Sequence, residues 1–108
     1  MKGEFIMSIE DTLKKQVSEN RVVLYMKGTP DAPMCGFSAN AVKLLEACGA
    51  EDVATVNVLE NDEIRQGIKE FSNWPTIPQL YVNGEFVGGS DILGEMYQSG
   101  ELSELFEK

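Results

Sequence analysis

The order of its β-favouring segments constrains the fold of this chain more than any other feature. The last two of these segments flank Asn83-Gly84, the dipeptide that most strongly signals a tight hairpin. The predicted strands are residues 22–26, 53–59, 79–82 and 85–87. A helix-favouring segment separates the first two, and the succession of strand, helix and strand favours a parallel crossover. We therefore predict an α/β domain with a four-stranded mixed sheet flanked by helices.

Apolar residues at helical spacing place helices between and around these strands. The first predicted helix has Ser8 as its N-cap, carries Ile9, Leu13 and Val17 on one face, and ends near Asn20. The later predicted helices cover about 37–48, 62–72, a segment from Ile92 to Tyr97 and a short turn from Leu102 to Phe106. Helices of this number can cover both faces of the sheet.

Length and composition limit the classes of protein to which the chain can belong. Its 108 residues fit one domain, predicted as residues 8–108, with residues 1–7 as a loose leader or an expression remnant. A net charge of −9 argues against nucleic acid as a partner, and no apolar run approaches the roughly 20 residues that span a membrane. The absence of histidine excludes Ser-His-Asp catalysis, Cys-His catalysis and metal sites built on imidazole.

Cys35 is the first candidate for chemistry. It follows the segment 28–34, which two prolines stiffen, and it precedes a helix-favouring run, so we predict it in the first turn of a helix. There, unpaired N–H groups and the helix dipole would stabilise a thiolate, although most lone cysteines are small buried hydrophobes. Three residues later, where a dithiol motif would have its second cysteine, the chain has Ser38.

The other cysteine, Cys48, is predicted to pack in the core. It lies at the end of the same predicted helix, where the dipole disfavours a thiolate, and Leu44 and Leu45 are close to it in sequence. About 20 Å of helix would separate it from Cys35, whereas a disulfide allows roughly 7 Å between Cα atoms. An exposed thiol and a distant one fit a reducing compartment. We therefore predict a cytoplasmic protein, or a mitochondrial matrix protein if the source is eukaryotic.

The segment Thr76-Ile77-Pro78 is a candidate for binding a peptide. It precedes a strand that we expect beside the Cys35 helix. A cis bond before Pro78 would offer the backbone N–H and C=O of Ile77 to an extended ligand. The simpler interpretation is an ordinary turn, because most X-Pro bonds are trans.

Two further pairs of residues have the chemistry to bind carboxylates. Arg65 and Lys69 stand four apart on one predicted helix, although, taken alone, this pair is better explained by a solvated face with local ion pairs. Ser90 and Asp91 follow two glycines at a predicted helix start, where N–H groups and a hydroxyl would bind a carboxylate. A plain N-cap is the alternative for this second pair.

Four motifs, in order along the chain, resemble those of the monothiol glutaredoxins of the CGFS type. They are Lys27-Gly28-Thr29-Pro30, Pro33-Met34-Cys35-Gly36-Phe37-Ser38, Trp74-Pro75-Thr76-Ile77-Pro78-Gln79 and Gly88-Gly89-Ser90-Asp91. The resemblance runs from about Ile9 to Leu105 and is greatest to single-domain bacterial and mitochondrial members. It implies a thioredoxin fold with an extra N-terminal helix and a cis bond before Pro78.

The same resemblance implies a groove for glutathione. Its implied binding residues are Lys27, Cys35, Arg65, Lys69, Thr76, Ile77, Ser90 and Asp91. The cationic side chains would meet the glycine carboxylate, and Lys27 would alternatively hold the Cys35 thiolate. The backbone of the segment before Pro78 would pair with the cysteinyl part, and the start of the last long helix would hold the γ-glutamyl end.

The resemblance further implies that Cys35 ligates a 2Fe–2S cluster. Such a centre normally takes four thiolates, and two chains with two glutathiones would supply them in a homodimer. The implied function is assembly, storage and transfer of clusters to apo iron–sulfur proteins, with a BolA-type protein as a further partner.

The alternative function is a glutathione-dependent thiol–disulfide oxidoreductase with Cys35 as nucleophile. Many family members carry a cysteine where this chain has Ser90. The chain therefore lacks a candidate resolving thiol, which weakens the oxidoreductase hypothesis and leaves cluster ligation unaffected.

Overall fold

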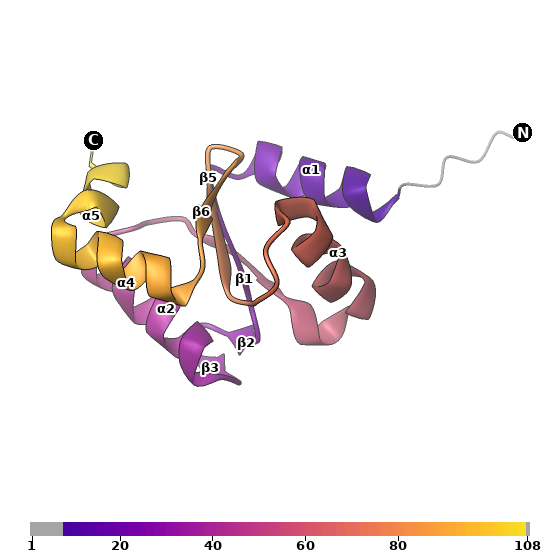
Figure 1. Ribbon diagram of the computed structural model, residues 1–108, viewed down its shortest axis with the longest axis horizontal. Helices are drawn as coiled ribbons and strands as arrows, with labels where there is room; N and C mark the ends of the chain where they lie inside the picture. The colour runs from indigo at the N-terminus through magenta and orange to yellow at the C-terminus, as the bar shows by residue number, and fades with distance from the viewer. Residues whose placement is uncertain (1–7, 108) are drawn as a thin grey trace, which may run out of the picture.

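The computed structural model describes residues 8–107 and confirms the predicted α/β architecture. Figure 1 shows a central sheet with helices on both sides. The helices are α1 (Ile9–Glu19), α2 (Gly36–Ala47), the short 3-10 helix η1 (Val58–Glu60), α3 (Asp62–Ser72), α4 (Ser90–Ser99) and α5 (Glu101–Leu105). The segment 1–7, predicted as a leader, lies outside the described residues.

The main sheet has four strands in the order β4-β1-β5-β6. Its strands are β1 (Val22–Met26), β4 (Ala54–Asn57), β5 (Gln79–Val82) and β6 (Glu85–Gly88). The pair β1 and β4 is parallel, whereas β1 with β5 and β5 with β6 are antiparallel. The predicted hairpin is confirmed: Asn83 and Gly84 connect β5 to β6 with φ of 53° and 81°, as a type I′ turn requires.

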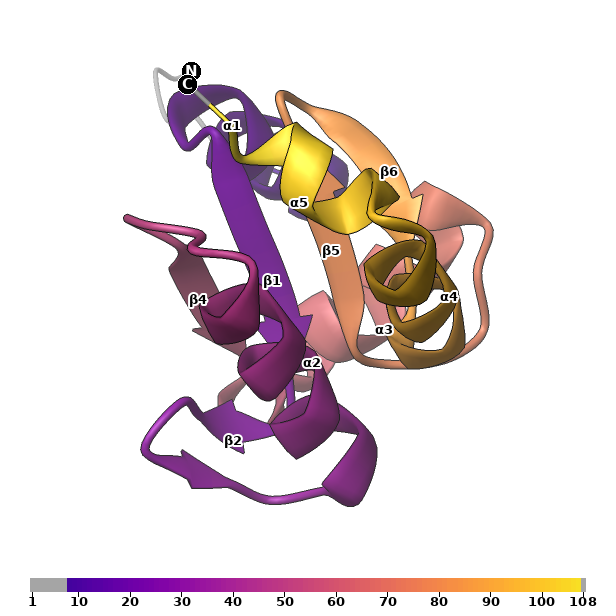
Figure 2. The same ribbon diagram turned by 90° about the vertical axis from the view of Figure 1, so that its left-hand side faces the viewer.

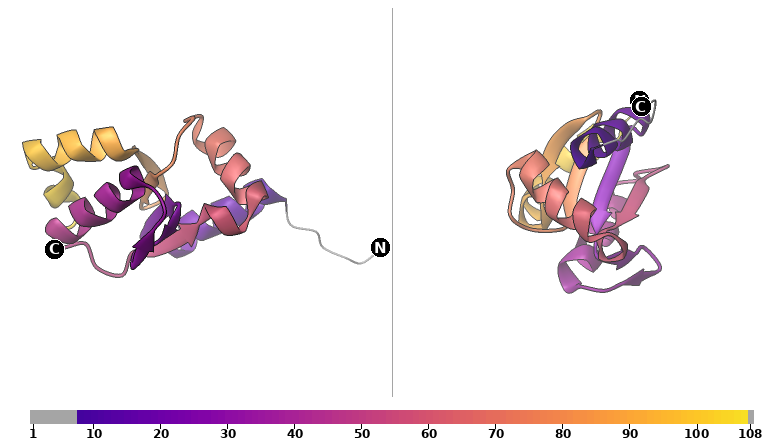
Figure 3. Two further views of the ribbon diagram at one scale, coloured as in Figure 1. Left: turned by 90° about the horizontal axis from the view of Figure 1, so that it is seen from below. Right: turned by 90° about the vertical axis from the view of Figure 1, so that its right-hand side faces the viewer.

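Each face of the sheet is covered by its own set of helices. One core cluster joins α1 and α3 to β1 and β5 through residues such as Leu13, Ile68 and Tyr25. The other joins α2, α4 and α5 to the opposite face through residues such as Leu45 and Leu93. Figures 2 and 3 show this three-layer arrangement from three further directions. Strand β1 is buried throughout because both faces are covered.

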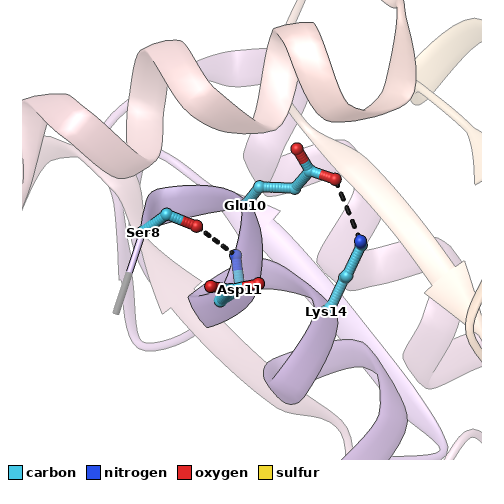
Figure 4. A network of polar contacts seen from close by, with 4 residues as sticks. All are labelled: Ser8, Glu10, Asp11 and Lys14. Carbon is cyan, nitrogen blue, oxygen red and sulfur yellow. Dashed lines mark hydrogen bonds and ion pairs between the residues drawn. The ribbon is translucent and has the colours of Figure 1, made fainter. Parts of the chain in front are cut away.

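The first helix begins where the sequence predicts. The Ser8 hydroxyl accepts a hydrogen bond from the N–H of Asp11 at 3.1 Å, and Glu10 pairs with Lys14 at 3.0 Å one turn later (Figure 4). These contacts satisfy an orphan N–H at the helix start and add a local ion pair. The extra N-terminal helix is therefore confirmed as a regular element that packs on α3.

Two predictions of local structure are wrong. The strand predicted over 53–59 is only β4, because the side chain of Asn57 accepts a hydrogen bond from the N–H of Leu59 and caps η1. The segment 28–34 is more than a stiff loop, since it forms the ribbon of β2 (Gly28–Thr29) and β3 (Ala32–Pro33). Figure 2 shows this ribbon projecting beyond the end of the main sheet.

Candidate functional site

A cavity of about 350 Å³ opens beside Cys35. The walls come from the end of β1, the start of α2, the segment before β5 and the start of α4. The lining residues are Lys27, Cys35, Phe37, Lys69, Trp74, Pro75, Thr76, Ile77, Pro78, Gly89, Ser90, Asp91 and Ile92. All the residues predicted for the glutathione groove except Arg65 meet here. Arg65 lies one helical turn before Lys69 on α3, outside this lining.

Cys35 is the N-cap of α2 rather than a residue of its first turn, which corrects the predicted position by one residue. The backbone N–H of Ser38 lowers the pKa of the Cys35 thiol most, and the N–H of Phe37, the Ser38 hydroxyl and the charge of Lys27 lower it further. Partial burial opposes them, but the net pKa is below the ordinary value. The N-cap position has this effect because its side chain faces the first unpaired N–H groups of the helix.

The Ser38 hydroxyl is placed to serve two groups. It is fully buried and accepts a hydrogen bond from the backbone N–H of Lys27 at 3.0 Å. Its own hydrogen is therefore free to be donated to the Cys35 thiolate. Ser38 thus joins the end of β1 to the start of α2, at the position where a dithiol motif has its second cysteine.

The ribbon β2–β3 fixes the approach to Cys35. The N–H of Met34 donates to the carbonyl of Lys27 at 2.9 Å, and the N–H of Gly28 donates to Oδ1 of Asn57 at 3.0 Å. Gly28 has φ of +91°, and a Cβ there would lie 2.5 Å from the carbonyl oxygen of Ala32. Only glycine fits where the backbone crosses this closely, and the crossing restricts the path of the ribbon.

The opposite wall of the cavity is formed by the segment before β5 and by the start of α4. The Ile77–Pro78 peptide is cis, which confirms that prediction. A Cβ on Gly89 would come within 3.2 Å of both the Pro78 carbonyl oxygen and Nε1 of Trp74, so a small residue is needed there. Ser90 begins α4 and receives a hydrogen bond from Nδ2 of Asn40 on α2 at 3.1 Å. The starts of α2 and α4 are therefore joined at the cavity.

Sequence reasoning missed two side chains that hold the site together. Asn40 fixes Ser90, and nothing in the local sequence distinguishes it from an ordinary polar residue on a helix. Gln79 carries a stronger signal, because it is a polar residue at the start of an otherwise apolar strand. It is fully buried, and its side-chain amide donates hydrogen bonds to backbone carbonyls of the segment that precedes it. A buried amide of this kind indicates a structural hydrogen bond.

Within residues 8–107, no group of three or more Cys, Asp or Glu side chains is arranged to hold a metal ion. None of the helices in the same range is long and apolar enough to cross a membrane.

The fold and the lone activated thiol define a thioredoxin-fold thiol protein, and the comparisons give the family. The sequence model of the glutaredoxin family matches residues 22–87. Monothiol glutaredoxin-5, mitochondrial, of Schizosaccharomyces pombe is 58% identical over 98 residues, covering 89% of this chain and 67% of that protein. Glutaredoxin 4 of Buchnera aphidicola is 52% identical over 102 residues, covering 94% of each.

A solved structure gives the same result. The solution structure of reduced poplar apo GrxS14 superposes with a TM-score of 0.77 at 54% identity, covering 89% of this chain and 87% of that one. The chain belongs to the glutaredoxin family, and within it to the monothiol glutaredoxins.

Proposed function

We propose that this chain binds glutathione in the cavity beside Cys35 and that two chains together hold a 2Fe–2S cluster for transfer to apo iron–sulfur proteins. The observation that carries the proposal is the state of Cys35. Its thiol has a lowered pKa and lines a cavity, and the second cysteine of the chain is the C-cap at the far end of the same helix. An activated thiol without a partner in its own chain is suited to sharing a ligand set.

The cavity offers a match for each part of glutathione. Its volume of about 350 Å³ lies within the usual range of small-molecule sites. The ammonium groups of Lys27 and Lys69 suit the glycine carboxylate, and the backbone at Ile77 suits the cysteinyl peptide group. Ser90 and Asp91, at the start of α4, suit the carboxylate and the ammonium of the γ-glutamyl end. Arg65 remains predicted as an outer cation for the glycine carboxylate.

The donor set of one chain is insufficient for a cluster, which favours a pair of chains. A 2Fe–2S centre takes four thiolates, and Cys35 is the one that this site supplies. Two chains and two bound glutathione thiolates would complete the set. The side chains of Met34 and Phe37 beside the thiol are 68% and 64% exposed, and a second copy would cover this apolar surface. The cluster would supply iron and sulfide as a cargo that an acceptor protein takes up.

Anaerobic reconstitution tests this proposal. The chain is incubated with iron, sulfide and glutathione, and the product is examined by visible absorption and by native mass. We expect a coloured dimer with two glutathiones, no colour for Cys35→Ser, and full colour for the matched Cys48→Ser. A colourless monomer from the unsubstituted chain, or a cluster retained by Cys35→Ser, would refute the proposal.

The second candidate function is glutathione-dependent reduction of mixed disulfides, and the lowered pKa of Cys35 favours it. The Cys35 thiolate would attack the glutathione sulfur of a protein–glutathione disulfide, releasing the protein thiolate and forming a Cys35–glutathione disulfide. A second glutathione thiolate would then attack that disulfide, releasing oxidised glutathione and the Cys35 thiolate. A glutathione-coupled disulfide assay measures this turnover, and a rate equal to that of Cys35→Ser would exclude it.

The remaining partners and the location follow from the proposed activity. The exposed surface at Met34 and Phe37 would receive an apo iron–sulfur protein or a BolA-type protein in place of a second copy. We propose the cytoplasm, or the mitochondrial matrix in a eukaryote, and the S. pombe relative is itself described as mitochondrial.

A further inference from the structure

The side chain of Gln79 ties the cis-proline segment to the sheet from inside the protein. Gln79 is the first residue of β5 and has no exposed surface. Its Nε2 donates to the carbonyl oxygens of Trp74 at 3.1 Å and of Thr76 at 3.0 Å. Because both partners are carbonyl oxygens, which only accept, the amide has one possible orientation. One buried group therefore holds two points of the segment 74–78.

These hydrogen bonds determine where the N–H of Ile77 points. In a trans peptide the C=O and the following N–H point in opposite directions, and the Thr76–Ile77 peptide is trans. Since the Thr76 carbonyl is turned inward to Gln79, the Ile77 N–H is turned away from it. Within the described part of the chain, no hydrogen-bond partner of the Ile77 N–H is found, and Ile77 lines the cavity. This N–H is free to bind a ligand carbonyl.

Gln79 is a costly residue for a purely structural role. Its Oε1 is buried and has no hydrogen-bond partner in the described structure. An orphaned buried acceptor lowers stability, and an apolar side chain of similar length would remove that cost only by leaving the Trp74 and Thr76 carbonyls without their donor. Tyr81, the next residue of β5 on the same face, is also buried and packs in the apolar cluster with α1 and α3. The amide is therefore better explained by the two carbonyls that it orients.

We propose that Gln79 is a positioning residue for glutathione, holding the Thr76 carbonyl inward so that the Ile77 N–H faces the peptide of the ligand. Gln79 itself does not line the cavity, so it acts through the segment 74–78. This inference rests on the proposed function, because it assigns a residue that prepares the site proposed for glutathione.

The experiment is a titration of the reduced chain with S-methylglutathione, followed by backbone amide NMR. This probe has the groups of glutathione but no free thiol, so it binds without forming a disulfide. Gln79→Met removes both hydrogen bonds while keeping side-chain length. Gln98→Met is the matched control, because Gln98 is exposed on α4 and outside the cavity lining.

In the unsubstituted chain we expect the Ile77 amide proton to move downfield as the ligand binds. For Gln79→Met we expect binding about tenfold weaker, with the Ile77 response lost, because the free peptide no longer holds one orientation. The control should bind as the unsubstituted chain does. A purely structural role would lower the unfolding midpoint of Gln79→Met and leave both the dissociation constant and the Ile77 response unchanged.

The outcomes separate this inference from the proposed function. Equal binding by Gln79→Met and by the unsubstituted chain overturns the positioning role and leaves the glutathione site intact. No response of the unsubstituted chain at millimolar ligand overturns the glutathione site itself. If Gln79→Met does not fold, couplings across the hydrogen bonds are measured in the unsubstituted chain, from Nε2 of Gln79 to the carbonyl carbons of Trp74 and Thr76. Their absence, or an Ile77 amide that does not move on binding, overturns the inference.

Discussion

The two cysteines of this chain lie at opposite ends of one helix and have opposite surroundings. Cys35 is the N-cap of α2 and Cys48 is its C-cap. At the first, N–H groups and a buried hydroxyl stabilise the thiolate. At the second, the thiol packs against the apolar cluster between α2 and α4, and Ser103 donates to its sulfur at 3.4 Å.

The direction of the helix accounts for part of this difference. The start of a helix has unpaired N–H groups and the positive end of the dipole, whereas its end has unpaired carbonyls. The same residue type therefore serves as a candidate ligand at one end and as a packing residue at the other. Substitutions and pH changes around the two thiols test how far this contrast extends into their surroundings.

The largest expected effect is on stability, at one glycine in the ribbon that precedes Cys35 and at one glycine that follows α2. Gly28→Ala should lower the free energy of unfolding by about 3 kcal/mol, because the new Cβ would meet backbone atoms while φ stays positive. Gly49→Ala is the control, since φ there is +74° but nothing lies within 4 Å. It should lose only about 1 kcal/mol. Urea unfolding measures both, and equal losses would contradict a rigid ribbon beside Cys35.

The second prediction concerns the reactivity of the two thiols. At pH 7, Cys35 should react with iodoacetamide about tenfold faster than Cys48, because the lowered pKa of Cys35 increases its own thiolate fraction. Peptide mass spectrometry after timed alkylation measures the two rates. The pH midpoint for Cys35 should lie below the ordinary value of a thiol, since its pKa is lowered. Equal alkylation rates at the two positions would contradict the contrast between an activated Cys35 and a packed Cys48.

The same shift has a consequence for stability with a defined sign. Because the pKa of Cys35 is lower in the folded than in the unfolded chain, its contribution to stability is present above the unfolded pKa. It is lost as the pH falls through the lowered, folded value. The difference in unfolding free energy between the unsubstituted chain and Cys35→Ser should therefore grow as the pH rises across this interval.

The third prediction compares the hydroxyls that contact the two sulfur atoms. Ser38→Ala removes one of the groups that lower the pKa of Cys35, so alkylation of Cys35 at pH 7 should slow by about threefold. Ser103→Ala removes the hydroxyl that donates to Cys48 and should leave the rate at Cys35 unchanged. If both substitutions slow Cys35 equally, the effect comes from loosened packing and not from the hydroxyl.

The smallest expected effect is that of the charge of Lys27. It is the last of the named causes that lower the pKa of Cys35, so Lys27→Met should slow alkylation by less than about twofold at low salt. The effect should vanish near 1 M salt, because dissolved ions screen the attraction between the Lys27 ammonium and the Cys35 thiolate. Lys43→Met, on the exposed side of α2, is the control. A larger loss that persists at high salt would indicate a direct hydrogen bond.

Most elements were predictable because their signals are local. The Asn83-Gly84 turn, the cap at Ser8 and the helix over 62–72 each depend on residues a few positions apart. The strand predicted over 53–59 was too long, because Asn57 ends it with a side-chain hydrogen bond that hydrophobicity does not reveal. The ribbon β2–β3 was missed because it depends on Gly28 crossing close to Ala32.

The candidate site, too, was predictable in part. Its chemical groups were recognisable from their motifs, but the exclusion of Arg65 from the cavity lining depends on which residues of α3 face it. Asn40 was missed because its partner Ser90 lies 50 residues away and only the fold brings it near. Gln79 was missed because its hydrogen bonds to carbonyls 5 and 3 residues earlier depend on the folded conformation of the segment 74–78.

The sequence by itself determined that a lone cysteine follows a rigid segment and begins a helix, in a chain without histidine and with its other cysteine too distant to pair. Helical spacing and residue chemistry suffice for those conclusions. The tertiary structure alone decided that Ser38 links Lys27 to Cys35 and that Gln79 turns the Ile77 N–H outward. The first depends on a hydrogen bond between two elements that packing brings together, and the second on the folded conformation of the segment 74–78.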